Sequence, residues 1–321
     1  MKVSIDMIDP QFRFRSRFIR VFLRYRNEKS LRFMGNMSQK MLGGRKSKKL
    51  NCEEVSIERK DGTYLRLLVY SAKRRMKEKN VPGVLWLHGG GYALGSATRA
   101  IPYAEKLIEA EECVVAAPDY TLSGEKPYPA ALMDCYTALA WMKSHAGERG
   151  LRPNQIFVGG DSAGGGLTAA LSMYARDQGE IGIAFQMLLY PMIDDRMTSD
   201  SMKDNDAPMW NEHSNRIAWK MYLGGLSGSD EVPAYAAPAR AADYSRLPPA
   251  FTFVGALDPF RDETVCYAEK LNNAGIEVEL YEYPGCFHAF DQASKRADKS
   301  RDAIEKMLAA YRHAVIHYFA E

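Results

Sequence analysis

The 321-residue chain is poor in cysteine and in long apolar runs. Its five cysteines are scattered, odd in number and lack the spacing of metal ligands, so the sequence offers neither a disulfide framework nor a zinc motif. No apolar run approaches the roughly 20 residues that a membrane-spanning helix needs. The N-terminus carries Asp6, Asp9 and Pro10 where a secretion signal would have its apolar core. These absences predict a cytoplasmic protein with reduced thiols and no metal or cofactor.

Internal repeats and low-complexity tracts are also absent, and the charge is unevenly distributed. Residues 1–50 hold fourteen Lys and Arg against three Asp and Glu, whereas the rest of the chain holds 29 basic and 37 acidic residues. Nothing beyond residue 50 supplies the basic surface or the aromatic platform that nucleic acid requires. We therefore expect no nucleic-acid partner.

Residues 10 to 42 alternate arginine with large apolar side chains, and Phe18 and Phe22 recur at helical spacing. This pattern predicts one or two amphipathic helices. A basic amphipathic helix can lie on an anionic membrane. The interpretation that we favour is a cover, whose apolar face packs on the main domain. Residues 1–50 are thus expected to form a helical cap segment, and residues 51–321 a catalytic domain.

From residue 53 onward, short apolar runs alternate with helical patterns. A hairpin is predicted around Asp61-Gly62. Strands are expected at 55–57, 64–70, 84–87, 113–117, 156–158, 184–190, 251–254 and 278–281. Helices are expected at 101–111, 129–145, 263–273 and 298–319, with another beginning near 167. The alternation predicts an α/β fold with a mostly parallel sheet of about eight strands, covered by helices on both faces and opened by the hairpin.

One long insertion breaks this alternation. Residues from 195 to about 247 show no clear strand and carry several methionines and aromatic side chains, Trp210 and Trp219 among them. An insertion of this length between two strands is commonly a lid or a pocket wall. The alternative is a surface excursion that packs these aromatics on itself.

A candidate nucleophile stands between a strand and a helix. Gly160-Asp161-Ser162-Ala163-Gly164 fits the pattern Gly-x-Ser-x-Gly, after a strand and directly before an Ala/Leu-rich helix. Glycines on both sides allow the sharp turn that holds the serine hydroxyl clear of the backbone. By itself the motif also fits an ordinary turn, and the strand-helix context is what favours Ser162 as a nucleophile.

An activated serine also needs donors for the developing oxyanion. His88-Gly89-Gly90-Gly91-Tyr92 follows a buried strand, at the sheet edge where α/β proteins bind their ligands. The amides of Gly90, Gly91 and Ala163 would make a three-donor oxyanion hole. A phosphate loop is less favoured because no lysine-serine or lysine-threonine pair follows the glycines. His88 itself is expected to brace this loop through its ring.

The base and its acid come from loops that follow the last strands. Among six histidines, His288 lies just past the strand at 278–281, and Asp258 lies just past the strand at 251–254. Each could be an ordinary polar loop residue, and Asp262 or Glu263 could simply cap the next helix. Together Ser162, Asp258 and His288 have the order Ser-Asp-His that α/β-hydrolases show.

Residues from about 80 to 291 resemble the hormone-sensitive-lipase-like branch of the α/β-hydrolases, also called family IV bacterial esterases. The motifs behind this resemblance are His-Gly-Gly-Gly at 88–91, Gly-Asp-Ser-Ala-Gly-Gly at 160–165, Leu-Pro-Pro-Ala at 247–250, Asp-Pro-Phe-Arg-Asp-Glu at 258–263 and Tyr-Pro-Gly-x-x-His at 283–288. The resemblance implies hydrolysis of short- to medium-chain carboxylic esters through an acyl-enzyme. It also implies a cap built from the N-terminal region and an insertion at about 195–240.

The chain departs from the family pattern in three places. Thr121, Ser123 and Gly124 stand where the family has Arg, Ala and Pro, so the ion pairs of that arginine are expected to be missing. Ala289 stands where a glycine usually follows the catalytic histidine. The arginine-rich N-terminus is also unusual for the family.

The sequence thus predicts a serine carboxylesterase acting on small ester substrates. Three alternatives remain: a small-molecule receptor on a hydrolase scaffold, an amidase or peptidase of the same fold, and a membrane-associated lipase. Plant hormone receptors of this branch resemble the first, but they replace the catalytic histidine, whereas His288 is present here. A homodimer is compatible with the sequence.

Overall fold

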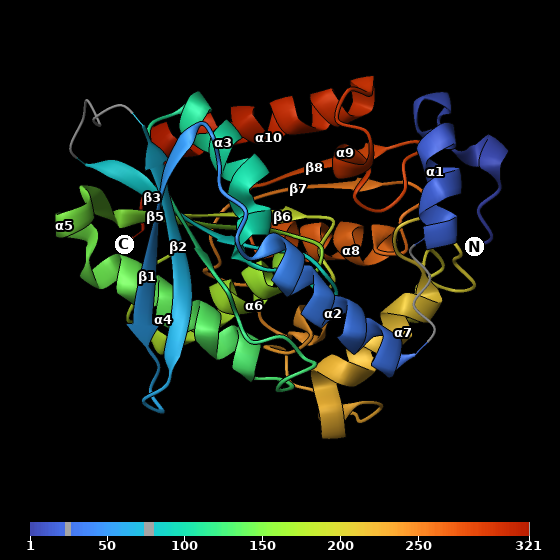
Figure 1. Ribbon diagram of the computed structural model, residues 1–321, viewed down its shortest axis with the longest axis horizontal. Coiled ribbons are helices and arrows are strands. Elements are labelled where there is room, and N and C mark those ends of the chain that lie inside the picture. Colours follow the sequence, from blue (N-terminus) through green and yellow to red (C-terminus); the bar gives the residue numbers. More distant parts are fainter. Residues whose placement is uncertain (23–26, 74–79, 321) are drawn as a thin grey trace.

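The computed structural model describes residues 1–22, 27–73 and 80–320. Eight strands form one sheet in the order β1-β2-β4-β3-β5-β6-β7-β8, with helices on both sides (Figure 1). The strands are β1 (Leu50–Glu58), β2 (Tyr64–Ala72), β3 (Val81–Leu87), β4 (Val114–Pro118), β5 (Leu151–Asp161), β6 (Phe185–Leu189), β7 (Ala250–Gly255) and β8 (Val278–Tyr283). Each predicted strand coincides with one of these, so the predicted α/β fold is confirmed.

Within the described residues, two α-helices precede the sheet, and from β3 onward every strand is followed by at least one helix. The α-helices are α1 (Pro10–Phe22), α2 (Glu28–Leu42), α3 (Ile101–Ala110), α4 (Ala130–Ser144), α5 (Ala146–Arg149), α6 (Ala163–Gln178), α7 (Glu212–Leu223), α8 (Arg261–Asn273), α9 (Phe290–Ala293) and α10 (Asp298–His317). Short 3-10 helices are η1 (Ile5–Met7), η2 (Ala97–Ala100), η3 (Gly224–Leu226) and η4 (Pro238–Arg240). Among the residues that the structure describes, no helix combines the length and the apolar character needed to cross a bilayer.

The hairpin forms where the sequence predicts it. Strands β1 and β2 pair antiparallel from Leu50 opposite Ala72 to Glu58 opposite Tyr64. Gly62 in the turn has a φ of 79°, which glycine adopts without strain. Strand β2 also pairs antiparallel with β4, and every later pairing in the sheet is parallel.

The two faces of the sheet have separate cores. Every residue of β3 is buried, as expected of a strand covered on both sides. Because side chains alternate along a strand, Val84 and Trp86 pack with α3 and α10, whereas Leu85 and Leu87 pack with α4 and α6. Figure 1 shows α3 and α10 above the sheet and α4, α6 and α8 below it.

The basic N-terminal region forms two helices, α1 and α2, and residues 23–26 between them lie outside the described residues. Helix α2 begins with a capping box, in which Asn27 and Ser30 each bond the other's backbone. It packs against α7, the helix of the long insertion, and Lys220 of α7 pairs with Glu28 at 2.7 Å. The insertion therefore contains a helix, α7, that the sequence analysis did not predict.

Candidate active site

Ser162 occupies a strained turn between β5 and α6. Its φ of 57° and ψ of −120° are unfavourable for a residue with a Cβ. The glycines on either side are required by space, because a Cβ at Gly164 would collide with the Leu87 carbonyl and one at Gly160 with the Gly164 backbone. The Ser162 amide donates to the Leu189 carbonyl at 2.9 Å, which fixes the turn to the neighbouring strand. The turn directs the hydroxyl above the carboxyl edge of the sheet.

The three side chains singled out in the sequence come together at this edge. The Nε2 atom of His288 lies 2.9 Å from Ser162 Oγ, and its Nδ1 atom lies 2.8 Å from Asp258 Oδ2. With the proton on Nδ1, the imidazole donates to Asp258 and accepts at Nε2 from the serine hydroxyl. Asp258 also accepts the Phe260 amide at 2.9 Å, which orients its carboxylate. Serine, base and acid therefore form one hydrogen-bonded row.

The row is almost closed to solvent. Ser162, His288 and Asp258 are 6%, 3% and 0% exposed. Phe260 and Tyr190 meet the imidazole edge-on, with ring centroids 5.1 Å and 4.9 Å away. A packed imidazole keeps its orientation, and low local polarity strengthens the hydrogen bonds that it makes.

The glycine loop after β3 lies beside the serine. Gly90 and Gly91 have φ values of 136° and 58°, both in the region that favours glycine. Within the described part of the chain, the amides of Gly90, Gly91 and Ala163 have no hydrogen-bond acceptor. Free amides at a helix start and in a glycine loop are suited to bind an oxyanion.

His88 braces this loop, as its position predicts. Its ring stacks on Tyr120 with centroids 4.2 Å apart, and its Nδ1 atom lies 3.0 Å from the Gly89 carbonyl oxygen. Burial lowers the pKa of His88, so the ring stays neutral. Within the described residues, no hydrogen bond joins His88 to Ser162, His288 or Asp258.

Helix α8 anchors the insertion instead of being capped by its own acids. Asp262 accepts the Ser201 amide at 2.8 Å, and buried Glu263 accepts the Ile193 amide at 2.8 Å. Burial raises the pKa of Glu263 well above its usual value. Both carboxylates hold the segment that leads from β6 into the insertion.

An arginine from the distant hairpin turn supplies a positive charge near Thr121, where the family pattern has an arginine. Arg59, after β1, pairs with Asp134 at 2.5 Å, and Asp134 also accepts the Thr121 amide at 2.7 Å. The stretch after β4 is thus joined to this ion pair through the amide of Thr121. Ala289 adopts a left-handed φ of 54°, where a glycine would fit without the cost of a Cβ.

Two features of the site have no signal in the sequence pattern. Trp210 of the insertion lies over the glycine loop, because a Cβ at Gly91 would collide with its ring. Its ring centroid is 6.4 Å from that of His288, and its Nε1 donates to Asn215 at 3.1 Å.

The second feature lies behind the serine. Asp161 accepts hydrogen bonds from the Gly89 amide at 3.2 Å and from Gln292 Nε2 at 3.0 Å.

Among the described residues, no group of three His, Cys, Asp or Glu side chains is placed to hold a metal ion. The chemistry that the site offers is that of a serine activated by an imidazole, with amides beside it for a developing negative charge.

Residues 84–292 match the family model described as the alpha/beta hydrolase fold. The chain belongs to the α/β-hydrolase family. It is 37% identical over 241 residues to the carboxylesterase NlhH of Mycobacterium tuberculosis, covering 74% of this chain and 75% of that protein. It is 32% identical over 209 residues to the gibberellin receptor GID1A of Arabidopsis thaliana, covering 62% of this chain and 60% of that protein.

Among solved structures, a bacterial heroin esterase has a TM-score of 0.87 and 33% identity, covering 98% of this chain and 99% of that one. These relatives place this α/β-hydrolase in the hormone-sensitive-lipase-like branch, as its motifs predict. The chain is a serine carboxylesterase.

Proposed function

We propose that Ser162, His288 and Asp258 carry out the ester hydrolysis of this enzyme. The observation that carries the proposal is the row Ser162 Oγ–His288 Nε2 and His288 Nδ1–Asp258 Oδ2, at 2.9 and 2.8 Å. Ser162 Oγ attacks the ester carbonyl carbon while His288 takes its proton, and the imidazolium returns that proton to the leaving alkoxide. Water, activated by the same imidazole, then releases the carboxylic acid from the acyl-serine.

Asp258 holds the imidazole in the tautomer that accepts at Nε2 and stabilises the imidazolium that forms. The amides of Gly90, Gly91 and Ala163 stabilise the tetrahedral oxyanion in this proposal. Their positions in a glycine loop and at a helix start, without other acceptors in the described residues, support that role.

The substrate proposal is a short- to medium-chain carboxylic ester. Trp210 supports it, because its ring lies against Gly91 and beside His288 and so narrows the space next to the serine. A bulky aromatic wall favours small acyl or alcohol groups over long ones.

Replacing Ser162 with Ala tests the mechanism. Turnover of p-nitrophenyl acetate and butyrate should fall by about 10⁴-fold or more, because the nucleophile is lost while the fold is kept. Ser144→Ala, an exposed serine on α4, is the matched control and should keep wild-type activity. Circular dichroism checks the fold of both variants. Wild-type turnover by Ser162→Ala would refute the mechanism.

The resemblance to a gibberellin receptor favours a second candidate, a small-molecule receptor on the same scaffold. The hydrogen-bonded His288 speaks against it. Labelling of Ser162 by a fluorophosphonate probe distinguishes an active nucleophile from a receptor pocket. An amidase or peptidase is distinguished by comparing an ester with its matching amide.

We also propose that residues 1–50 and about 195–240 together form a cap over the catalytic domain, residues 51–321. Leu31 of α2 is buried, and Gly35 lies so close to the Ala93 carbonyl that no Cβ would fit. Glu28 and Lys220 tie the two cap segments together. This packing favours a cover over membrane attachment, and flotation with anionic vesicles checks that preference.

The proposed location is the cytoplasm, because all five cysteines carry free thiols. A homodimer stays a prediction, which analytical ultracentrifugation checks.

A further inference from the structure

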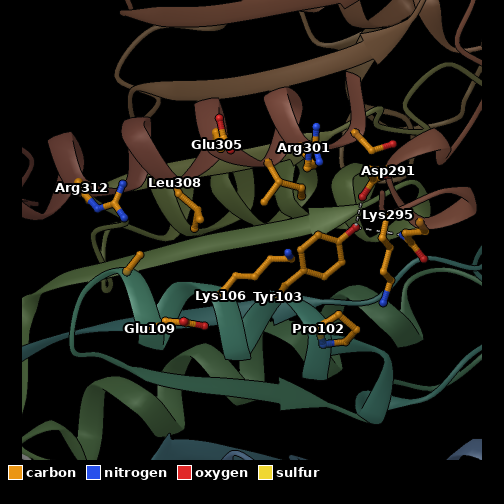
Figure 2. A pocket seen from close by; sticks show the side chains of 14 residues that line it. Pro102, Tyr103, Lys106, Glu109, Asp291, Lys295, Arg301, Glu305, Leu308 and Arg312 are labelled. Atoms are coloured by element: carbon orange, nitrogen blue, oxygen red, sulfur yellow. Dashed lines mark hydrogen bonds between the residues drawn. The ribbon is translucent and has the colours of Figure 1, made fainter. Parts of the chain in front are cut away.

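A groove lies on the far side of the sheet from α6, and the proposed mechanism does not use it. It runs between α3 and α10, is closed at one end by α9, and has a volume of about 400 Å³ (Figure 2). Ile304 and Leu308 of α10 and Pro102 of α3 give it an apolar strip. The groove thus combines an apolar strip with charged side chains, and neither Ser162, His288 nor Asp258 lines it.

The rim of the groove carries more free positive than negative charge. Within the described residues, Lys106, Lys295 and Arg312 have no partner, and Glu305 has none either. The other two charges of the rim are already paired, Glu109 with Lys49 at 3.8 Å and Arg301 with Asp298. Lys106 is half-buried, and within the described residues its ammonium group has no anionic partner.

Lys106 and Tyr103 are neighbours on one face of α3, and Figure 2 shows both projecting into the groove. A cation above an apolar strip is complementary to an anion that carries an alkyl chain. Asp291, the acid at the inner end, forms no ion pair with Lys106 in the described part of the chain. Its carboxylate accepts hydrogen bonds from the hydroxyls of Tyr103 and Tyr190, each at 2.9 Å.

We propose that this groove binds a monocarboxylate with a short alkyl chain, its carboxylate on Lys106 and its chain along Ile304 and Leu308. A carboxylate forms charge-assisted hydrogen bonds with an ammonium group, and the chain leaves water for the apolar strip. Binding itself does not depend on the proposed function. The ligand could come from ester hydrolysis or from elsewhere, and both sources share this chemistry.

The inner end of the groove is connected to the active site. Gln292 lines the groove and lies within hydrogen-bond distance of the Tyr103 hydroxyl at 3.0 Å and of Asp161 Oδ2 at 3.0 Å. Asp161 precedes Ser162 and accepts the amide of Gly89 in the glycine loop. A ligand that shifts Tyr103 or Gln292 is therefore expected to change the position of the oxyanion donors.

Isothermal titration with sodium hexanoate tests the binding. Lys106→Glu should weaken hexanoate binding by about tenfold or more, since a charge-assisted hydrogen bond is lost and a repulsion is added. Arg312→Glu, at the outer end of the groove, should weaken it less. Lys60→Glu, an exposed lysine of the hairpin turn, makes the same charge change elsewhere and should bind as wild type.

Acetate and hexylamine separate the two halves of the recognition. Acetate lacks the chain and should bind more weakly than hexanoate, and hexylamine lacks the anion and should not bind in the groove. Equal binding of hexanoate by wild type and Lys106→Glu, or binding as tight for acetate as for hexanoate, would overturn the proposal.

The effect on turnover rests on the proposed function and is measured separately. Hexanoate in the active site would raise the apparent KM of p-nitrophenyl acetate in every variant. Hexanoate in the groove should change kcat in wild type and in Lys60→Glu but not in Lys106→Glu. An unchanged kcat despite Lys106-dependent binding would overturn the connection alone. An inactive wild-type enzyme would defeat the proposed function and leave the titration valid.

Discussion

Asp161 and Ser162 are adjacent in the chain and both almost buried, yet they belong to two polar networks of different construction. Ser162 leads to His288 and then to Asp258, in a single row with an imidazole at its centre. Asp161 leads to Gln292, which is joined through the hydroxyls of Tyr103 and Tyr190 to Asp291. The turn at the end of β5 thus places one side chain in each of the two networks.

The two networks differ in the group at their centre, which is an imidazole in the Ser162 row and a pair of tyrosine hydroxyls in the Asp161 network. An imidazole can accept a proton at one nitrogen while it keeps its bond at the other, so the Ser162 row can transfer charge. Burial raises the pKa of Tyr103 and Tyr190 well above the usual value, so these hydroxyls remain donors at any working pH. The Asp161 network can therefore fix positions, and the Ser162 row can perform chemistry.

Replacing the acid of the Ser162 row should have the largest effect on activity. Asp258→Asn should lower kcat by about 10³- to 10⁴-fold, because an amide in place of the carboxylate favours the wrong imidazole tautomer. Asp291→Asn makes the same chemical change in the other network and should cost about tenfold at most. Steady-state kinetics with p-nitrophenyl butyrate measures both. Equal losses in the two variants would erase the distinction between the networks.

The stability of the protein should depend on pH through the carboxylate of Asp291. Burial raises the pKa of Asp291 from 3.8 to about 6, despite the two tyrosine hydroxyls that lower it. The folded protein therefore binds this proton more tightly than the unfolded chain does. The stability contribution of Asp291 is fully present below pH 3.8 and is lost as the pH rises through about 6.

Asp291→Asn removes this dependence. The free energy of unfolding of the variant, relative to wild type, should rise by about 2 to 3 kcal/mol between pH 4 and pH 7. Urea denaturation at several pH values measures the difference, in which the other titrating groups cancel. A difference that stays constant with pH would mean that Asp291 is already ionised at pH 4 in the folded protein.

The sequence predicts those parts of the molecule whose pattern lies within one short stretch of the chain. Runs such as Val84–Leu87 identify buried strands, and their alternation with helices leads to the parallel sheet. Ser162 directly follows β5 and His288 lies in the loop after β8. Because parallel strands end at one edge of a sheet, their meeting could be expected.

The second network has no such local signature. Tyr103 comes from α3, Tyr190 follows β6, and Asp291 and Gln292 come from α9. Only the packing of these elements brings the four together. The same holds for Arg59, whose pair with Asp134 connects the hairpin to α4. Residue types at these positions look like ordinary surface or core choices until the tertiary structure is known.

The insertion is the third region that local patterns leave open. Its aromatics predict a lid or a self-packed excursion, and helical spacing alone does not say which ring faces the serine. Trp210 is held by its bond to Asn215 and lies against the glycine loop, whereas Trp219 packs on Tyr92 with centroids 5.6 Å apart. Substrate size is therefore expected to depend on Trp210.

Trp210→Ala should have the smallest effect, and it should fall on selectivity. Removing the ring enlarges the space beside Ser162, so the ratio of kcat/KM for p-nitrophenyl octanoate to that for the butyrate should rise by about tenfold, a typical value for added methylenes in an apolar pocket. Trp141→Ala, on α4, is the matched control and should leave the ratio unchanged. Trp210→Phe keeps more of the packing and should give an intermediate ratio. A ratio that does not change in either Trp210 variant would mean that Trp210 does not limit substrate size. Selectivity would then depend on residues other than this ring beside Ser162.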